Sequence, residues 1–288
     1  KLKLCQEHIL EYKPKIVLLI DFPGFNMRIA KFSKKNGFNV HYYIAPKAWA
    51  WNKNRAFQLS NYTDKVYSIL PFEKDFFKKY NCEIRYVGNP LTHYVGEKFI
   101  SKKKIRNVVS LLPGSRESEL RYSIPILKKI IKSYSKNKFI VCAVNNVDQK
   151  YYKDFYNYNN VEILYEKTYR AVSVSNLSIV MSGTASLEVA YLNVPQIVVY
   201  KSSLISYIIA RLLVRVDYIS LVNLILNKKL VTELIQNDFN YKSLSYEIDK
   251  FDNNYHVDKM ISGYKRLKKI IGNKNATNEV AKNILENL

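Results

Sequence analysis

Apolar and polar positions alternate along the chain as short apolar runs separated by longer amphipathic stretches. This pattern predicts parallel βαβ units, because buried parallel strands are short and continuous in their apolar character. In the first third of the chain, strands are expected at residues 16–20, 40–44, 65–70 and 84–87, and helices at 27–35, 53–60 and 73–80.

A second α/β series follows a polar, lysine-rich stretch, Val95 to Arg106, which we interpret as an interdomain connection. Its strands are expected at 108–112, 138–143, 161–164, 177–181 and 195–200, and its helices at 118–134, 147–156, 168–174 and 184–192. Further helices are expected at 228–236, 254–271 and 278–288.

The pattern predicts an α/β fold of two Rossmann-like domains with a cleft between them, where α/β proteins bind ligands. The N-terminal domain is assigned residues 1–98, and its start is expected to be missing because the first strand follows Lys1 so closely. The second domain is assigned residues 99–253. Residues 254–288 are expected to form helices that pack back toward the N-terminal domain.

Composition adds a strong positive charge to this picture. The 288 residues carry a formal charge of +22, which invites a nucleic-acid or anionic-membrane interpretation. The lysines are scattered, so we attribute most of the charge to compositional drift and leave open a basic face for anionic lipid or phosphate. No apolar run approaches the ~20 residues of a membrane span. The three cysteines and four histidines have no metal-ligand spacing, so no metal or cofactor is expected in a cytosolic protein.

The stretch L-L-P-G-S-R-E-S-E, Leu111 to Glu119, is typical of a strand, a tight turn and a helix start. Free N–H groups at a helix N-terminus attract anions. Gly114 permits a close turn, Ser115 is a candidate N-cap, and Arg116 offers a bidentate fork for phosphate. A capped helix with a surface arginine fits these residues equally well.

A second strand–turn–helix, V-M-S-G-T-A-S-L-E, runs from Val180 to Glu188. Ser182, Gly183 and Thr184 form a small, hydroxyl-rich helix entry that suits phosphate, and Glu188 could accept hydrogen bonds from a ribose diol. An ordinary capped helix is the alternative. Two such entries in one domain favour a nucleotide site.

Asp21, in L-I-D-F-P-G-F-N, follows a predicted parallel strand at the sheet edge where α/β proteins bind ligands. A carboxylate there can serve as a general base. On local residues alone, a turn or cap aspartate before Pro23 explains it better.

Two further stretches suggest contact with sugar or lipid. Trp49, Trp51 and Arg55 lie in Y-Y-I-A-P-K-A-W-A-W-N-K-N-R, where aromatic and cationic side chains alternate. Arg211 and Arg215 share one face of an apolar segment, Ser203 to Tyr218, that is too short to span a bilayer. For the tryptophan stretch the alternative is a packed loop, and for the arginine stretch it is a core helix.

Taken together, six motifs resemble one family, the lipid-A-disaccharide synthases. They are L-I-D-F-P-G-F-N, Y-Y-I-A-P-K-A-W-A-W-N-K-N-R, L-P-F-E-K-D-F-F-K-K-Y, L-L-P-G-S-R-E-S-E, S-G-T-A-S-L-E-V-A and D-Y-I-S-L-V-N-L, in the family's order from Lys15 to about Gln236.

The resemblance implies a GT-B-type inverting glycosyltransferase. It implies transfer of a diacylglucosamine from its UDP-sugar to the 6-hydroxyl of a diacylglucosamine 1-phosphate, giving the β-1,6 lipid A disaccharide phosphate and UDP. The expected location is the cytoplasmic face of the inner membrane, as a peripheral protein. No metal, cofactor or nucleic acid is implied, and a homodimer is left open.

Residue by residue, Asp21 matches the family's essential aspartate and Arg116 the essential arginine of L-P-G-S-R. Ser182, Gly183, Thr184 and Glu188 match the nucleotide-side helix entry. Asn223 matches the asparagine of S-L-P-N-L, although Val222 replaces the proline.

Two departures accompany the resemblance. Gly24 stands where many members carry a second aspartate. The family's N-terminal G-E-x-S-G-D loop has no counterpart, so we expect a fragment or a second polypeptide. The rival hypotheses are a non-catalytic relic, a basic module for anionic lipid or RNA, and another GT-B enzyme such as a UDP-GlcNAc 2-epimerase.

Overall fold

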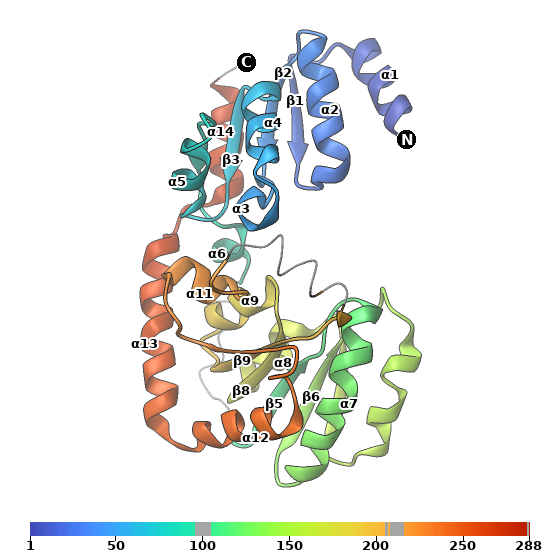
Figure 1. The fold of residues 1–288 in the computed structure, drawn as a ribbon, viewed down its shortest axis with the longest axis vertical. Coiled ribbons are helices and arrows are strands. Elements are labelled where there is room, and N and C mark those ends of the chain that lie inside the picture. Colours follow the sequence, from blue (N-terminus) through green and yellow to red (C-terminus); the bar gives the residue numbers. More distant parts are fainter. Residues whose placement is uncertain (96–104, 205–206, 208–215, 287) are drawn as a thin grey trace. The chain divides into compact units, whose positions relative to one another are not determined.

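The computed structural model describes residues 1–95, 105–204, 207, 216–286 and 288, and excludes the side chain of Trp51. The chain forms two compact units (Figure 1). The first unit contains Lys1–His93 and Ile271–Leu288. The second contains Tyr94–Ile209 and Val216–Ile270. Arg211 and Arg215, the predicted arginine pair, lie outside the described residues.

A four-stranded parallel sheet organises the first unit, in the order β1-β2-β3-β4. The strands are β1 (Ile16–Ile20), β2 (Asn39–Tyr43), β3 (Lys65–Ser68) and β4 (Arg85–Tyr86). The helices are α1 (Leu2–Tyr12), α2 (Pro23–Lys35), α3 (Ala48–Trp51), α4 (Asn54–Tyr62), α5 (Glu73–Lys78), α6 (Pro90–Val95) and α14 (Ala276–Leu285), and α6 contains the boundary between the units. All four predicted strands are present, whereas α1 was not expected from the sequence.

Strand β1 shows how side-chain alternation builds this core. Val17 and Leu19 are buried against Ile29 and Ala30 of the core, because alternate residues of a strand point to the same face. Leu18 and Ile20 point the other way and are 38% and 54% exposed. In the described sheet, β1 is an edge strand with one covered and one open face.

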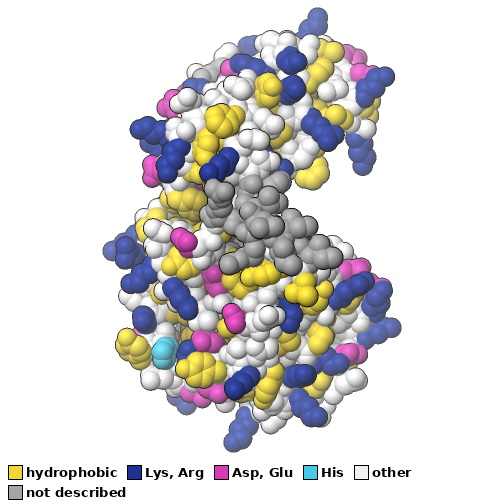
Figure 2. All heavy atoms as spheres, viewed as in Figure 1, with side chains coloured by type: hydrophobic (Ala, Val, Ile, Leu, Met, Phe, Trp, Pro, Cys, Tyr) yellow, Lys and Arg dark blue, Asp and Glu magenta, His cyan; other side chains and the backbone are white. Residues whose placement is uncertain are grey.

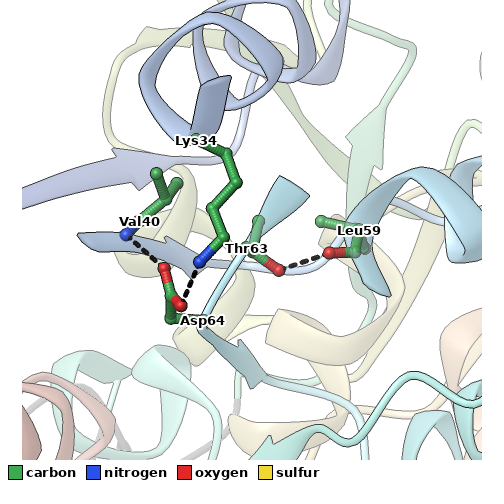
Figure 3. Close-up of polar contacts among 5 residues, drawn as sticks. All are labelled: Lys34, Val40, Leu59, Thr63 and Asp64. Carbon is green, nitrogen blue, oxygen red and sulfur yellow. Dashed lines mark hydrogen bonds and ion pairs between the residues drawn. The ribbon is translucent and has the colours of Figure 1, made fainter. Parts of the chain in front are cut away.

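At the opposite end of this sheet from the β1–α2 turn, Asp64 ties three elements together (Figure 3). Its carboxylate accepts hydrogen bonds from the Lys34 ammonium of α2 and, at 2.8 Å, from the backbone N–H of Val40 in β2. Burial opposes ionisation of Asp64, but these hydrogen bonds prevail and lower its pKa. The neighbouring Thr63 hydroxyl donates to the Leu59 carbonyl at 2.6 Å and closes α4. The hydrogen bonds of Asp64 join α2, which begins just after the turn at Asp21, to β2, whose Tyr43 carbonyl accepts from the Asp21 N–H.

The second unit contains a six-stranded parallel sheet in the order β10-β9-β8-β5-β6-β7. Its strands are β5 (Val108–Leu112), β6 (Lys138–Ala143), β7 (Val161–Tyr165), β8 (Leu177–Met181), β9 (Gln196–Tyr200) and β10 (Thr232–Ile235). Its helices are α7 (Glu117–Ser133), α8 (Thr168–Val174), α9 (Ala185–Tyr191), α11 (Leu221–Leu226), α12 (Tyr241–Asp249) and most of α13 (Asn254–Ile271).

Two predicted helices of this unit are wrong. Residues 228–236 contain strand β10, because Thr232–Ile235 pairs in parallel with Ile197–Tyr200 of β9. Residues 147–156 form two 3-10 turns, Gln149–Tyr151 and Lys153–Asn157. Asp148 caps the first turn by accepting from the Lys150 N–H at 2.9 Å. At 228–236 the pairing with β9 outweighs the helical spacing of apolar residues. At 147–156 local capping by Asp148 does so.

Among the described residues, the chain changes unit between His93 and Tyr94 and between Ile270 and Ile271. Helix α13 is anchored in the second unit by buried Tyr264, whose hydroxyl accepts a 3.0 Å hydrogen bond from the Gln196 side chain. Helix α14 belongs to the first unit, where Glu279 forms a 3.9 Å ion pair with Arg85. The predicted domain limits at 98 and 253 stay a proposal.

Positive charge is spread over the visible surface of both units. On the face shown in Figure 2, Lys and Arg side chains are scattered, with fewer Asp and Glu side chains among them. None of the helices in the described part of the chain is long and apolar enough to cross a membrane.

Candidate active site

Asp21 occupies a strained turn at the C-terminal end of β1. Asp21 and Phe22 have φ angles of 47° and 43°, in the left-handed region that costs an L-residue roughly 1–2 kcal/mol. Hydrogen bonds hold this conformation: the Asp21 N–H donates to the Tyr43 carbonyl at 2.9 Å, and the Asn26 amide donates to the Asp21 carbonyl at 2.8 Å. Strain of this kind concentrates at functional sites. The carboxylate itself is exposed at the sheet edge.

Tyr42 supports this turn from inside the protein. The buried phenol donates to the Asp21 carbonyl at 2.7 Å. Burial and the Asp21 charge raise the pKa of Tyr42, while Arg55 lowers it. Arg55 therefore lies within electrostatic range of the same turn. Tyr42 remains a neutral donor, and the sequence analysis did not identify it.

Trp49 is half-buried in α3, and its indole is engaged inside the unit. The indole N–H donates to the Glu73 carboxylate at 2.9 Å, and the ring meets Phe72 edge-on with centroids 5.0 Å apart. Glu73 begins α5 and is only 1% exposed. Burial raises its pKa to about 7, against the hydrogen bonds from Trp49 and the backbone. The motif L-P-F-E contained this residue, but no local signal marked its burial.

In the second unit, the turn after β5 is shaped around a carboxylate. Gly114 has a φ of 128°, and a Cβ atom there would lie 2.7 Å from the Glu119 carboxylate oxygen. That oxygen accepts from the Ser115 N–H at 2.8 Å, and Arg116 lies 3.4 Å from the other oxygen. The turn thus accommodates negative charge from its own helix, as a helix N-terminus favours.

Arg116 is the N-cap residue of α7, so the prediction that Ser115 is the N-cap is wrong. The helix begins one residue earlier than expected, and it has no side-chain cap hydrogen bond because a guanidinium has no acceptor. Glu119 instead reaches back to the Ser115 N–H. The Arg116 side chain is 78% exposed and available to a ligand.

The second predicted helix entry lies at the end of β8, which is the neighbour of β5 in the sheet. The structure therefore places the Ser182 turn on the strand next to the Arg116 turn. The Ser182 hydroxyl donates to the Ile219 carbonyl at 3.1 Å, and Thr184 is the exposed N-cap residue of α9. Open space surrounds Gly183.

Glu188 lies one turn into α9 and is hydrogen-bonded to Tyr169 of α8. Burial raises the pKa of Glu188, and the tyrosine hydrogen bond opposes that shift. The carboxylate that was considered for ribose binding is thus held in a defined orientation by a neighbouring helix.

Asn223 is fully buried, and its amide makes four hydrogen bonds within the chain. The oxygen accepts from the N–H groups of Leu230 and Val231, and the nitrogen donates to the Val231 carbonyl and to Glu233 at 2.8 Å. Direct contact with a nucleotide requires breaking these bonds. In this structure, Asn223 fixes the segment between α11 and β10.

Glu233 of β10 completes this network and was missed by the sequence analysis, which placed it in a helix. Its carboxylate accepts from the N–H groups of Ile219 and Ser220 at 2.9 and 3.0 Å. Because Ile219 also accepts from Ser182, the Glu233 network connects β10 to the Ser182 turn.

The structure thus gathers the candidate residues at the C-terminal edges of two sheets. Asp21, Trp49 and Arg55 follow β1 and β2 of the first unit. Gly114–Arg116 and Ser182–Thr184 follow β5 and β8 of the second. Within the described parts of the chain, no group of three or more His, Cys, Asp or Glu side chains could hold a metal ion.

Comparison with known proteins identifies relatives along almost the whole chain. A family model described as lipid-A-disaccharide synthetase matches residues 2–285. The chain is 37% identical to the lipid-A-disaccharide synthase of Syntrophus aciditrophicus (strain SB), covering 82% of this chain and 66% of that protein. It is 33% identical to lipid-A-disaccharide synthase 1 of Legionella pneumophila (strain Lens), covering 94% and 75%. The chain therefore spans about two thirds to three quarters of these relatives' lengths.

Solved structures show the same architecture at low sequence identity. UDP-GlcNAc 2-epimerase from Neisseria meningitidis, bound to UDP-GlcNAc, matches with a TM-score of 0.70 and 13% identity, covering 99% of this chain and 80% of that one. The Methanocaldococcus jannaschii epimerase, in complex with UDP-GlcNAc and UDP, matches with a TM-score of 0.60 and 13% identity, covering 99% and 79%. At this identity the likeness shows the fold, and the predicted GT-B-like α/β class is confirmed.

Proposed function

The chain belongs to the lipid-A-disaccharide synthase family, and on that basis we propose that it joins two acylated glucosamines. The donor is a UDP-diacylglucosamine, the acceptor is a diacylglucosamine 1-phosphate, and the products are the β-1,6 disaccharide phosphate and UDP. The observation in the structure that supports the proposal is the strained turn at Asp21, which presents this carboxylate at the sheet edge.

Asp21 is the proposed general base. Its carboxylate takes the proton from the acceptor 6-hydroxyl, whose oxygen attacks the donor anomeric carbon from the face opposite UDP. The bond to the diphosphate breaks with its electron pair, so UDP leaves and the anomeric configuration inverts. Tyr42 supports this role through the Asp21 carbonyl, since it keeps the turn in place while the carboxylate reacts.

Arg116 is the proposed stabiliser of the departing diphosphate. Its guanidinium is exposed, and the neighbouring turn accommodates a carboxylate at the Ser115 N–H. A donor phosphate can take the place of Glu119 at this position, because both groups are anionic acceptors. Gly114 provides the close backbone approach.

The remaining donor contacts come from the Ser182–Thr184 turn on the adjacent strand. We assign Glu188 to the nucleotide ribose, oriented by Tyr169. Asn223 is assigned a shaping role in place of direct contact, because its amide is already satisfied.

The acylated substrates call for a membrane surface, and we propose peripheral attachment at the cytoplasmic face of the inner membrane. Trp51, Arg55, Arg211 and Arg215 remain the contact candidates. Trp49 is a weaker one, because its polar atom is bound to Glu73. A homodimeric assembly is likewise a proposal.

The test is an assay of full-length protein with UDP-diacylglucosamine and the acylated acceptor, with products identified by mass spectrometry. The expected products are the tetraacyl disaccharide phosphate and UDP in equal amounts. Release of UDP without disaccharide, or epimerisation of UDP-GlcNAc, would contradict the proposal. Asp21→Asn provides the inactive control, since it keeps the side-chain shape and removes the base.

A further inference from the structure

Glu73 is the only carboxylic acid among the buried polar residues of the described chain. A buried carboxylate is costly unless it is hydrogen-bonded, because burial removes the charge from water. A carboxylate retained in such a position, beside a ligand-binding edge, is therefore a candidate for a functional role.

The contacts of Glu73 join two loops of the first unit. One carboxylate oxygen accepts from the Trp49 indole at 2.9 Å, and the other accepts from the Leu70 N–H at 3.3 Å. Phe72, the residue before Glu73, meets the Trp49 ring edge-on. The loop after β2 and the loop after β3 are thus held to each other through one carboxylate and one indole.

These loops lie at the edge that carries Asp21. Asp21 follows β1, Trp49 follows β2 and Glu73 follows β3, and the three strands are consecutive in a parallel sheet. Helix α4, which immediately follows α3, provides Arg55, whose charge acts on Tyr42 beneath the Asp21 turn. A displacement of α3 therefore reaches the surroundings of the proposed base.

The charge of Glu73 can change near neutral pH. Burial raises its pKa to about 7, whereas Trp49, Leu70 and the charge of Lys47 in the β2–α3 loop favour the ionised form. Tyr86 of β4 faces it as a neutral phenol, and Lys74 and Asp75 of its own helix are exposed. The strength with which Glu73 accepts from Trp49 thus depends on its protonation.

We propose that Glu73 is a positioning residue for the acceptor side of the reaction: it holds Trp49, and with it α3, at the sheet edge that presents Asp21. The inference rests on the proposed function of the first unit. Glu73 acts through Trp49 and does not contact substrate.

The first experiment follows Trp49 directly by fluorescence in intact protein. A Trp51→Phe background leaves Trp49 as the one tryptophan of these 288 residues. Its emission is expected to titrate with a midpoint near pH 7, because ionisation of Glu73 changes its hydrogen-bond partner. Glu73→Gln removes this transition, and the matched control Asp75→Asn, an exposed acid of the same helix, retains it.

The second experiment separates acceptor from donor. In Glu73→Gln and in Trp49→Phe, KM for the acylated acceptor is expected to rise about 10-fold to 100-fold, because a misplacement of about 1 Å can have an effect of up to about 100-fold. KM for the UDP-sugar and the affinity for UDP alone stay at wild-type values. Asp75→Asn leaves both constants unchanged.

The outcomes distinguish this inference from the function on which it rests. Absence of disaccharide with the wild-type protein overturns the proposed function, while the fluorescence titration still decides whether Glu73 holds Trp49. Normal synthesis by wild type, with no titration of Trp49 or with equal changes in both KM values, overturns the positioning role. If Glu73→Gln does not fold, Trp49→Phe decides, because it removes the held partner and leaves the carboxylate intact.

Discussion

The two strand-to-helix turns that carry the proposed chemistry solve the same backbone problem differently. The turn after β5 uses Gly114 at a φ of 128°, where glycine is unstrained. The turn after β1 uses Asp21 and Phe22 in the left-handed region, where the backbone of both residues is strained. Glycine suffices where the backbone is proposed to approach the ligand. A residue with a strained backbone stands where the side chain itself is proposed to react.

The largest expected effect comes from Asp21→Gly, which gives the strained turn after β1 a glycine like that of the turn after β5. Disaccharide formation should fall by about 10²–10⁴ with the loss of the base. The free energy of unfolding should stay level or rise by up to about 1 kcal/mol, because glycine relieves the strain. Activity assays and urea unfolding measure the two effects. Phe22→Gly is the matched control and should relieve strain while retaining activity. Near-normal disaccharide synthesis by Asp21→Gly would show that Asp21 is not the base.

Arg116→Ala tests the turn after β5. We expect kcat/KM to fall by about 10²–10³, since a preorganised charge stabiliser is lost. The melting temperature should not change, because the side chain is 78% exposed. Arg121→Ala, in the same helix, is the control. A fall in activity no larger than that of Arg121→Ala contradicts the assignment.

The first unit should respond to pH through Glu73. The pKa of Glu73 is raised from 4.5 to about 7, so the folded state binds more protons than the unfolded state between these values. The contribution of Glu73 to the stability of this unit should therefore fall as pH rises from about 4.5 to about 7, by up to about 3 kcal/mol, and then level off. Urea titrations at stepped pH measure this slope. Glu73→Gln should flatten the slope of unfolding free energy against pH. An equal slope in that variant would show that another group titrates.

Gly114→Ala should destabilise the second unit by about 1–3 kcal/mol, through a left-handed φ and a clash with Glu119. Thermal unfolding provides the measurement. Gly183→Ala is the comparison, because open space surrounds that residue, and its cost should be smaller. Equal costs at both glycines argue against the conformational reason.

The smallest effect is expected for Gly24→Asp, which restores the second aspartate of many family members. Nothing lies within 4 Å of a Cβ atom built at Gly24, so stability should change by no more than about 0.5 kcal/mol. Activity should also be unchanged. A gain in turnover in the same assay would show that this position contributes to catalysis after all.

Much of the fold followed from local pattern. Strands such as Val108–Leu112 and Leu177–Met181 were predicted with their observed bounds, because buried parallel strands are continuous apolar runs. Strand β10 was not, since Thr232–Ile235 is as compatible with a helix until β9 pairs with it. The 3-10 turns at 149–157 escaped prediction because their apolar spacing is helical, although Asp148 caps a tighter turn.

By itself, the sequence determined the apolar strands, the turns that follow them and the motifs of one family, including Asp21 and Arg116. These are local properties, set by side-chain type, order and spacing. Only the tertiary structure decided that Glu73 is buried against Trp49 and that the Asn223 amide makes four internal hydrogen bonds. It also decided that the Glu119 carboxylate occupies the Arg116 turn. Burial and hydrogen-bond partners depend on residues that are far apart in the sequence and close in space. The local pattern of the sequence does not specify those contacts.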